Sequence, residues 1–291
     1  MSGAAPLVSI ASAGTLATAV ASAAAVPQPG GAALLLGGLD SANTAVGAIQ
    51  SFDGTQTTTA AAALPAAVGG AGAVQFAGTT YLFGGAGTGG PTTDIVSIAQ
   101  GGTPTIVASL PQPTSNAAVA RIGGTAYVIG GSNGTTDLST IVAYTPNVGS
   151  RTVASLPEPV EGAAAAVLGG NVYVVGGADG NTTLNTIYRF DPSSATVTRI
   201  GSLPQPLTNA AAVPAHGKIV VIGGTRTVAG DQTAEIVGFP ATGHPVTVLG
   251  TLPVKLDDAA AVSTPTGFLV LGGVEDDGQT NATIYKVRVN A

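Results

Sequence analysis

Polar residues recur directly before alanine-rich stretches of this chain, and three of them are acidic. The set comprises Asn116, Glu161, Asn209, Asp257 and Asp258. Amide and carboxylate side chains hydrogen-bond hydroxyl groups, and two carboxylates held at different pKa values can perform acid–base chemistry. Two interpretations follow: a polar pocket for a sugar or other hydroxylated ligand, and solvated polar caps on the ends of strands.

Glu161 is the carboxylate best suited to acid–base work. Asp257 and Asp258 are adjacent, and successive side chains of an extended strand point to opposite faces. We therefore expect them to diverge, and a pair made of Glu161 and either aspartate to be the more useful one.

A metal centre is not expected. Glu275-Asp276-Asp277-Gly278 is the densest acidic run, but it lacks the alternating carboxylates and the distal Glu of a calcium loop. It is predicted to be an exposed acidic turn. The chain has no cysteine, which excludes disulfides, thiolate nucleophiles and thiolate metal sites. We predict no cofactor.

Composition excludes two classes of partner. The 9 basic residues are scattered singly in a chain of net charge −6, whereas nucleic-acid binding needs clustered Lys and Arg. The mean hydropathy is +0.43, yet Gly, Thr, Ser, Asn or Pro interrupts every apolar run before it reaches the length of a membrane helix. We expect neither nucleic-acid binding nor membrane insertion.

A repeat of 46–49 residues positions these side chains. Its clearest marker is a glycine pair after an apolar run, found at Gly37-Gly38, Gly84-Gly85, Gly130-Gly131, Gly176-Gly177, Gly223-Gly224 and Gly272-Gly273. A Leu-Pro lies about twenty residues before each of the last five pairs. A fixed period in this range predicts an array of identical supersecondary units.

The repeat resembles the kelch motif, in which an apolar strand with a Tyr three residues before Gly-Gly is followed by a strand with an aromatic residue and then by Leu-Pro. Tyr81, Tyr127 and Tyr173 occupy the Tyr position, and Phe190–Pro204 is the best-matching segment. The chain has no Trp, and Val197 stands at the usual Trp position. The resemblance covers nearly the whole chain and implies a β-propeller.

We therefore predict an all-β protein, a single six-bladed kelch-type propeller over residues 1–291 with four-stranded blades. The alanine-rich innermost strands are predicted at Ser22–Val26, Gly70–Val74, Asn116–Val119, Gly162–Val167, Asn209–Val213 and Asp258–Val262. Alanine also favours helix, but flanking Gly, Pro and Thr argue against helices here. Leu7–Ala11 is predicted to complete the last blade and close the ring, which removes an open sheet edge.

The predicted role is non-catalytic binding of a protein or carbohydrate, through the channel mouth and the loops between the second and third strands. Kelch-like propellers also include carbohydrate-active enzymes. A sugar epimerase or mutarotase-like activity would need a carboxylate and a basic residue, for which Glu161 and Arg226 are the candidates. Composition favours a monomeric bacterial protein, extracytoplasmic and derived from a longer anchored chain.

Overall fold

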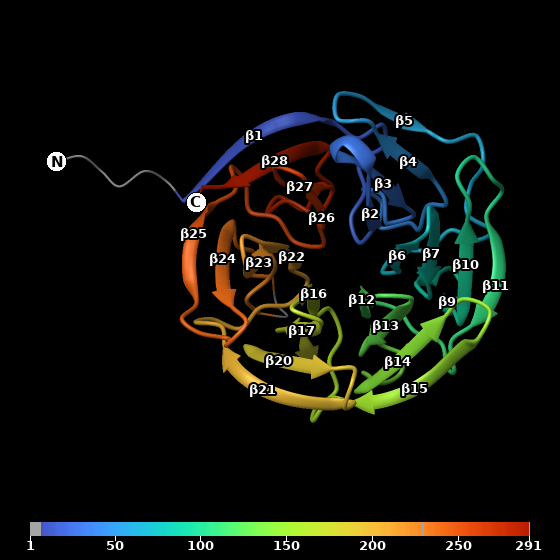
Figure 1. Cartoon of the computed structure of the whole chain (residues 1–291). Coiled ribbons are helices and arrows are strands. Elements are labelled where there is room, and N and C mark those ends of the chain that lie inside the picture. Colours follow the sequence, from blue (N-terminus) through green and yellow to red (C-terminus); the bar gives the residue numbers. More distant parts are fainter. Residues whose placement is uncertain (1–6, 228–229, 291) are drawn as a thin grey trace.

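Six antiparallel sheets of four strands each form a ring around a central axis (Figure 1). The structure is a computed structural model that describes residues 7–227 and 230–290. Each sheet is one blade, and its strands follow one another from the axis to the rim. The prediction of an all-β, six-bladed propeller is confirmed.

The blades are numbered here in chain order, and their strands run from axis to rim. Blade 1 consists of β2 (Ala24–Gln28), β3 (Ala32–Leu36), β4 (Ile49–Phe52) and β5 (Thr57–Thr59). Blade 2 consists of β6 (Gly72–Phe76), β7 (Thr79–Phe83), β10 (Asp94–Ile98) and β11 (Thr105–Ser109). Blade 3 consists of β12 (Ala118–Ile122), β13 (Thr125–Ile129), β14 (Thr140–Thr145) and β15 (Gly149–Ser155). Blade 4 consists of β16 (Ala164–Leu168), β17 (Asn171–Val175), β20 (Thr186–Asp191) and β21 (Thr196–Ser202). Blade 5 consists of β22 (Ala211–Ala215), β23 (Lys218–Ile222), β24 (Glu235–Pro240) and β25 (Thr247–Thr251). Blade 6 consists of β26 (Ala260–Thr264), β27 (Gly267–Leu271), β28 (Thr283–Val289) and β1 (Val8–Thr15).

The remaining elements are small. A 3₁₀ turn, η1 (Pro29–Gly31), joins β2 to β3. Two short hairpins lie in loops between second and third strands: β8 (Ala86–Gly87) with β9 (Gly90–Pro91), and β18 (Ala178–Asp179) with β19 (Thr182–Thr183). No helix in the described part of the chain is long and apolar enough to cross a membrane.

The first strand closes the ring, as predicted. β1 pairs antiparallel with β28 from Val8↔Val289 to Thr15↔Thr283, with a bulge between Ser12 and Gly14. It is longer than the predicted Leu7–Ala11 and forms the rim strand of blade 6 beside the last strand of the chain (Figure 1). Blade 6 therefore has the same four-stranded build as the other blades.

The innermost strands begin two residues later than the sequence predicts. The expected first residues are Ser22, Gly70, Asn116, Gly162, Asn209 and Asp258, and all six have positive φ between +49° and +64°. A left-handed residue turns the chain out of an extended strand, so each strand starts only after the turn. The alanine-rich segments are strands and not helices.

Each glycine pair attaches its blade to the next one. In blade 4 the N–H of Gly177 donates a 2.8 Å hydrogen bond to the carbonyl of Leu207 in the connection to blade 5. A Cβ on Gly176, whose φ is +63°, would lie 2.0 Å from that carbonyl oxygen. The other five pairs donate to the equivalent carbonyls of Val68, Thr114, Val160, Leu256 and Val20. The pairs are therefore structural junctions between blades.

The hydrophobic core lies between neighbouring blades. Tyr127 of blade 3 packs edge-on against Phe190 of blade 4, with ring centroids 5.3 Å apart, and Phe83 of blade 2 packs against Tyr144 of blade 3 at 5.4 Å. β17, β23 and β27 are buried over their last four residues, as expected for strands covered on both faces. The interfaces between blades thus fix the positions of the inner strands around the axis.

Candidate functional site at the axial cavity and the loop face

Six peptide groups form a closed ring of hydrogen bonds around the axis. Each N–H donates to the carbonyl of the equivalent residue in the preceding blade at 2.7–3.0 Å, through the series Ser22, Gly70, Asn116, Gly162, Asn209, Asp258 and back to Ser22. The positive φ of these residues turns their peptides across the gaps between blades. Because backbone atoms alone make this ring, the six side chains are free to differ.

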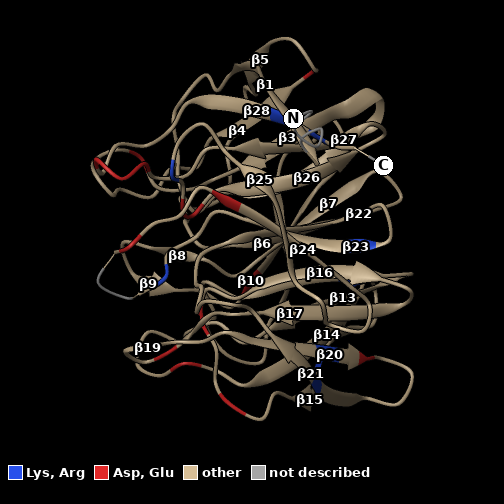
Figure 2. Cartoon of the chain, turned by 90° about the vertical axis from the view of Figure 1, so that its left-hand side faces the viewer, with Lys and Arg blue, Asp and Glu red and all other residues tan. Residues whose placement is uncertain are grey.

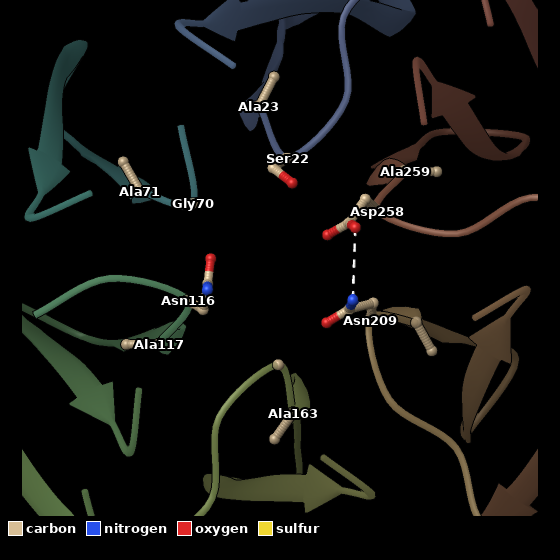
Figure 3. Close-up of a pocket in the computed structure, with 12 residues that line it drawn as sticks. Ser22, Ala23, Gly70, Ala71, Asn116, Ala117, Ala163, Asn209, Asp258 and Ala259 are labelled. Carbon is tan, nitrogen blue, oxygen red and sulfur yellow. Dashed lines mark hydrogen bonds between the residues drawn. The ribbon is translucent and has the colours of Figure 1, made fainter. Parts of the chain in front are cut away.

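The ring residues and the alanine that follows each of them line a cavity of about 150 Å³ on the axis (Figure 3). Ser22, Asn116, Asn209 and Asp258 place polar atoms around it, and Gly70 and Gly162 leave open positions. Three residues of the predicted site, Asn116, Asn209 and Asp258, therefore share one cavity.

Glycine is required beside each asparagine. A Cβ at Gly70 would lie 2.1 Å from Asn116 Oδ1, and a Cβ at Gly162 would lie 2.3 Å from Asn209 Oδ1. Both asparagine side chains thus lean toward the preceding blade. Asn209 Nδ2 donates a 3.3 Å hydrogen bond to Asp258 Oδ2 (Figure 3).

Asp258 is the charged group of the cavity. Protein atoms surround its carboxyl group, although the cavity leaves part of its surface accessible. Burial, followed by the negative charge of Asp257, raises its pKa to about 7, and Glu161 contributes in the same direction. A hydrogen bond from Ser22 opposes this shift. Half-ionisation near neutral pH makes Asp258 an unusual carboxylate.

Glu161 lies one residue before the ring position of its blade and belongs to a carboxyl pair that the sequence analysis missed. Burial raises its pKa, and the charge of Asp137 raises it further, while Ser132 and Asn116 lower it through hydrogen bonds. Asp137 lies in the loop between β13 and β14, and its Oδ2 accepts a 2.7 Å hydrogen bond from the N–H of Gly180 in the next blade. Asp137 contacts Glu161 across the gap between two blades, and the repeat pattern of the sequence does not predict such a contact.

Asp257 takes the equivalent place in blade 6 and points away from the axial cavity. Its Oδ2 accepts a 2.6 Å hydrogen bond from Thr225 Oγ1 of blade 5, while Oδ1 is buried and has no hydrogen-bond partner among the described residues. The expectation that Asp257 and Asp258 diverge is confirmed.

Arg226 is engaged in another part of the loop face. It forms an ion pair with Glu235 at 3.2 Å and a 3.3 Å hydrogen bond to Thr233. These residues line a cavity of about 220 Å³ between blades 4 and 5, whose walls include Leu203 and Val237. Arg226 and the axial residues therefore line different cavities.

The acidic turn of blade 6 has the form the sequence predicts. Glu275 exchanges backbone hydrogen bonds with Gln279 and Gly278, and Asp277 Oδ1 accepts a 2.9 Å bond from the N–H of Gln279. Asp276 lies 3.7 Å from the Lys255 ammonium group. Across the described residues, no group of three or more His, Asp or Glu side chains is arranged to hold a metal ion.

A larger hollow lies away from the axis. It measures about 680 Å³ between blades 1 and 2 and is lined mainly by apolar residues such as Leu34, Ile49 and Ile98. None of the predicted site residues contributes to it. Its size alone does not make it the site, since the converging polar groups are those of the axial cavity.

Charge divides sharply between the two faces of the ring. The loop face is defined here as the face that carries the loops between second and third strands and the connections from each rim strand to the next blade. All of the 15 acidic residues except Asp53 and Asp191 lie on it, together with only two basic residues, Arg226 and Lys255. Figure 2 shows these acidic segments on the loops at the left of the view. The other seven Lys and Arg residues lie within strands.

Comparison with known proteins agrees with this architecture. The kelch motif model matches residues 113–155 and 159–204, which span blades 3 and 4. A search of the curated proteins finds no significant match. Kelch repeats in a β-propeller are a general type of protein-binding module. The two matched blades and the four others share one four-stranded build and one glycine-pair junction. The chain is therefore a six-bladed β-propeller in which blades 3 and 4 match the kelch motif.

Proposed function

We propose that this propeller is a non-catalytic binding module that holds a basic segment of a protein partner on its loop face, around the mouth of the axial cavity. The segregation of charge is the observation that carries the proposal. A face with thirteen of the 15 acidic residues and two basic ones creates a negative potential that attracts and orients a cationic partner.

The build of the loop face supports binding. The loops between second and third strands differ from blade to blade, and two of them form hairpins of their own, while the strands beneath them keep one pattern. Binding residues are commonly found on loops held by a rigid scaffold. The twelve residues that line the axial cavity include no aromatic side chain on which a sugar ring could stack. We therefore favour a protein ligand over a carbohydrate.

The test is selection of ligands from a displayed library of random dodecapeptides. Enrichment of Lys and Arg is expected, together with at least tenfold weaker binding to the triple variant Asp40→Asn, Asp179→Asn, Asp277→Asn. Asparagine retains the turn-capping hydrogen bonds that Asp40 and Asp277 accept. The control, Thr58→Lys, Val107→Lys, Val148→Lys, changes net charge equally at exposed positions off this face. Selected peptides without basic residues, or equal loss in the control, would contradict the proposal.

A second candidate is a carbohydrate-active enzyme of the epimerase or mutarotase type. The Asp137–Glu161 pair favours it, because a carboxyl whose pKa is raised by a neighbouring carboxylate can act as a general acid. The test follows the interconversion of the anomers of reducing sugars by NMR. Acceleration that is lost in Glu161→Gln and retained in Asp179→Asn would support the enzyme; equal rates with and without protein would exclude it for those sugars.

The monomeric state and the extracytoplasmic bacterial origin remain proposals based on composition. Sedimentation equilibrium at several protein concentrations tests the first of them. A mass that rises with concentration would contradict it.

A further inference from the structure

The side chains that line the axial cavity present more free hydrogen-bond acceptors than free donors. The backbone N–H groups of the six ring residues all donate within the ring. Asn209 donates its amide to Asp258, and Asn116 interacts through its amide with Glu161. The Ser22 hydroxyl hydrogen-bonds Asp258. Among the side chains, a carboxylate and two amide carbonyl oxygens therefore face the cavity, contributed by three separate blades (Figure 3). Asn209 Oδ1 also accepts a 3.4 Å hydrogen bond from Thr208 Oγ1.

We infer that the axial cavity is a receptor for a primary ammonium group that enters from the loop face. An ammonium group carries three donors and no acceptor, which matches a lining of the Asp258 carboxylate and the Oδ1 atoms of Asn116 and Asn209. Hydrogen bonds between an ammonium group and a carboxylate are roughly twice as strong as neutral ones. A cavity of about 150 Å³ can enclose a small organic group of roughly the size of benzene.

The surroundings of Asp258 lack a positive charge. Its closest ionisable neighbours, Asp257 and Glu161, are both acidic. The two basic residues of the loop face are paired elsewhere, Arg226 with Glu235 and Lys255 with Asp276. A buried carboxylate without a cation is costly, and a bound ammonium group supplies the missing charge.

A path for the rest of the ligand adjoins the cavity. A pocket of about 250 Å³ lies between the loop at Leu39–Asn43 and the loop at Val274–Thr280, and Ser22 and Asp258 line both this pocket and the axial cavity. An alkyl stem can therefore leave the axis toward the loop face. The ammonium group could belong to a lysine side chain of a partner or to a free alkylamine, and a lysine source rests on the proposed function.

Calorimetric titration with n-butylammonium chloride at pH 8 tests the site by itself. We expect saturable binding, no binding of 1-butanol and at least a tenfold loss of affinity in Asp258→Asn. Asp191→Asn, which removes the same charge at a turn off the loop face, should stay within twofold. Equal binding of 1-butanol, unchanged affinity in Asp258→Asn, or displacement by equimolar potassium chloride would overturn the inference.

A second ligand keeps the test independent of any folding defect in Asp258→Asn. Tetramethylammonium carries the same charge as butylammonium but has no N–H donor, so it should bind the wild type at least tenfold more weakly. Equal binding of the two cations would contradict the site.

Peptides that contain a single lysine separate the two sources and the two proposals. Binding of butylammonium without binding of any basic peptide supports the cavity and contradicts the proposed function. Binding of basic peptides equally to wild type and Asp258→Asn, without binding of butylammonium, contradicts the cavity and leaves the proposed function standing.

Discussion

Asp257 and Asp258 are consecutive residues whose carboxylates serve different structures. Asp257 bridges to Thr225 of the preceding blade at 2.6 Å, whereas Asp258 faces the axial cavity and accepts from Asn209 at 3.3 Å. Asp258 has a φ of +50°, so the two residues do not form an extended strand, and their separation comes from a turn. Substitutions of the two residues should therefore have different effects.

Replacing Asp258 by asparagine should stabilise the protein above neutral pH. Because its folded pKa is raised to about 7, the folded state binds a proton more tightly than the unfolded state does, and stability falls as pH rises from about 4 to about 7. Asp258→Asn removes this loss, so its advantage in free energy of unfolding should grow over that range and level off above it, at no more than about 4 kcal/mol. Urea denaturation between pH 4 and pH 9 measures it; an advantage independent of pH would contradict the shifted pKa.

The glycine-pair junction predicts a strong contrast between two alanine substitutions in blade 4. Gly176 and Gly169 have φ of +63° and +59°, but a Cβ would lie 2.0 Å from the Leu207 carbonyl oxygen at Gly176 and within 4 Å of nothing at Gly169. Gly169→Ala should cost about 1 kcal/mol of backbone strain. Gly176→Ala should cost a further 1–3 kcal/mol from the clash. Thermal denaturation of both variants measures the two losses of stability. Equal losses would show that the junction tolerates a side chain at Gly176.

Removing the charge of Asp137 should lower the pKa of Glu161. Asp137 raises that pKa both by its charge and by its hydrogen bond, so Asp137→Asn leaves burial as the main remaining cause. NMR titration of the glutamate side chains should show the Glu161 midpoint shifting downward, while Asp231→Asn, in a loop of a different blade, leaves it in place. An unchanged midpoint in Asp137→Asn would mean that the two carboxyl groups do not interact.

Deleting β1 should open the ring at blade 6. The strand covers β28 along Val8↔Val289 to Thr15↔Thr283, and Val8 is buried against blade 5. We expect a loss of at least about 3 kcal/mol from burial alone, with self-association through the exposed edge of β28. Light scattering and denaturation of a chain beginning at Leu16 measure both effects. A peptide of residues 7–15 added in trans should restore stability, and a stable monomer without β1 would contradict the closure.

Most of the fold could be predicted because the repeat is strict. The glycine pairs at a spacing of 46–49 residues set the number of blades, and the likeness of Leu7–Ala11 to a rim strand located the closure. The start of each inner strand was misplaced by two residues, since alanine is equally compatible with the strand and with the turn before it. Ser, Gly, Asn and Asp at the six ring positions were the unused signal, because these residues favour turns and, apart from serine, readily adopt a left-handed backbone.

The candidate site was less predictable. Asn116, Asn209 and Asp258 could be grouped because they hold the same place in three repeats. Arg226 could not be placed, because its loop differs from the others in length and its partner, Glu235, follows that loop. Asp137 was missed for a related reason. It approaches Glu161 from a neighbouring blade, and the repeat pattern of the sequence does not predict contacts between loops of different repeats.

The hoop of six peptide bonds around the axis has an electrostatic consequence. Its dipoles run head to tail in one sense, and a closed circle of equal vectors sums to nothing. These six peptides thus impose almost no field of their own along the bore, and the charge there comes from the side chains of the ring positions. A replacement of Asp258, the one charged residue among them, should change the sign of the charge that the bore accepts without disturbing the circle that supports it.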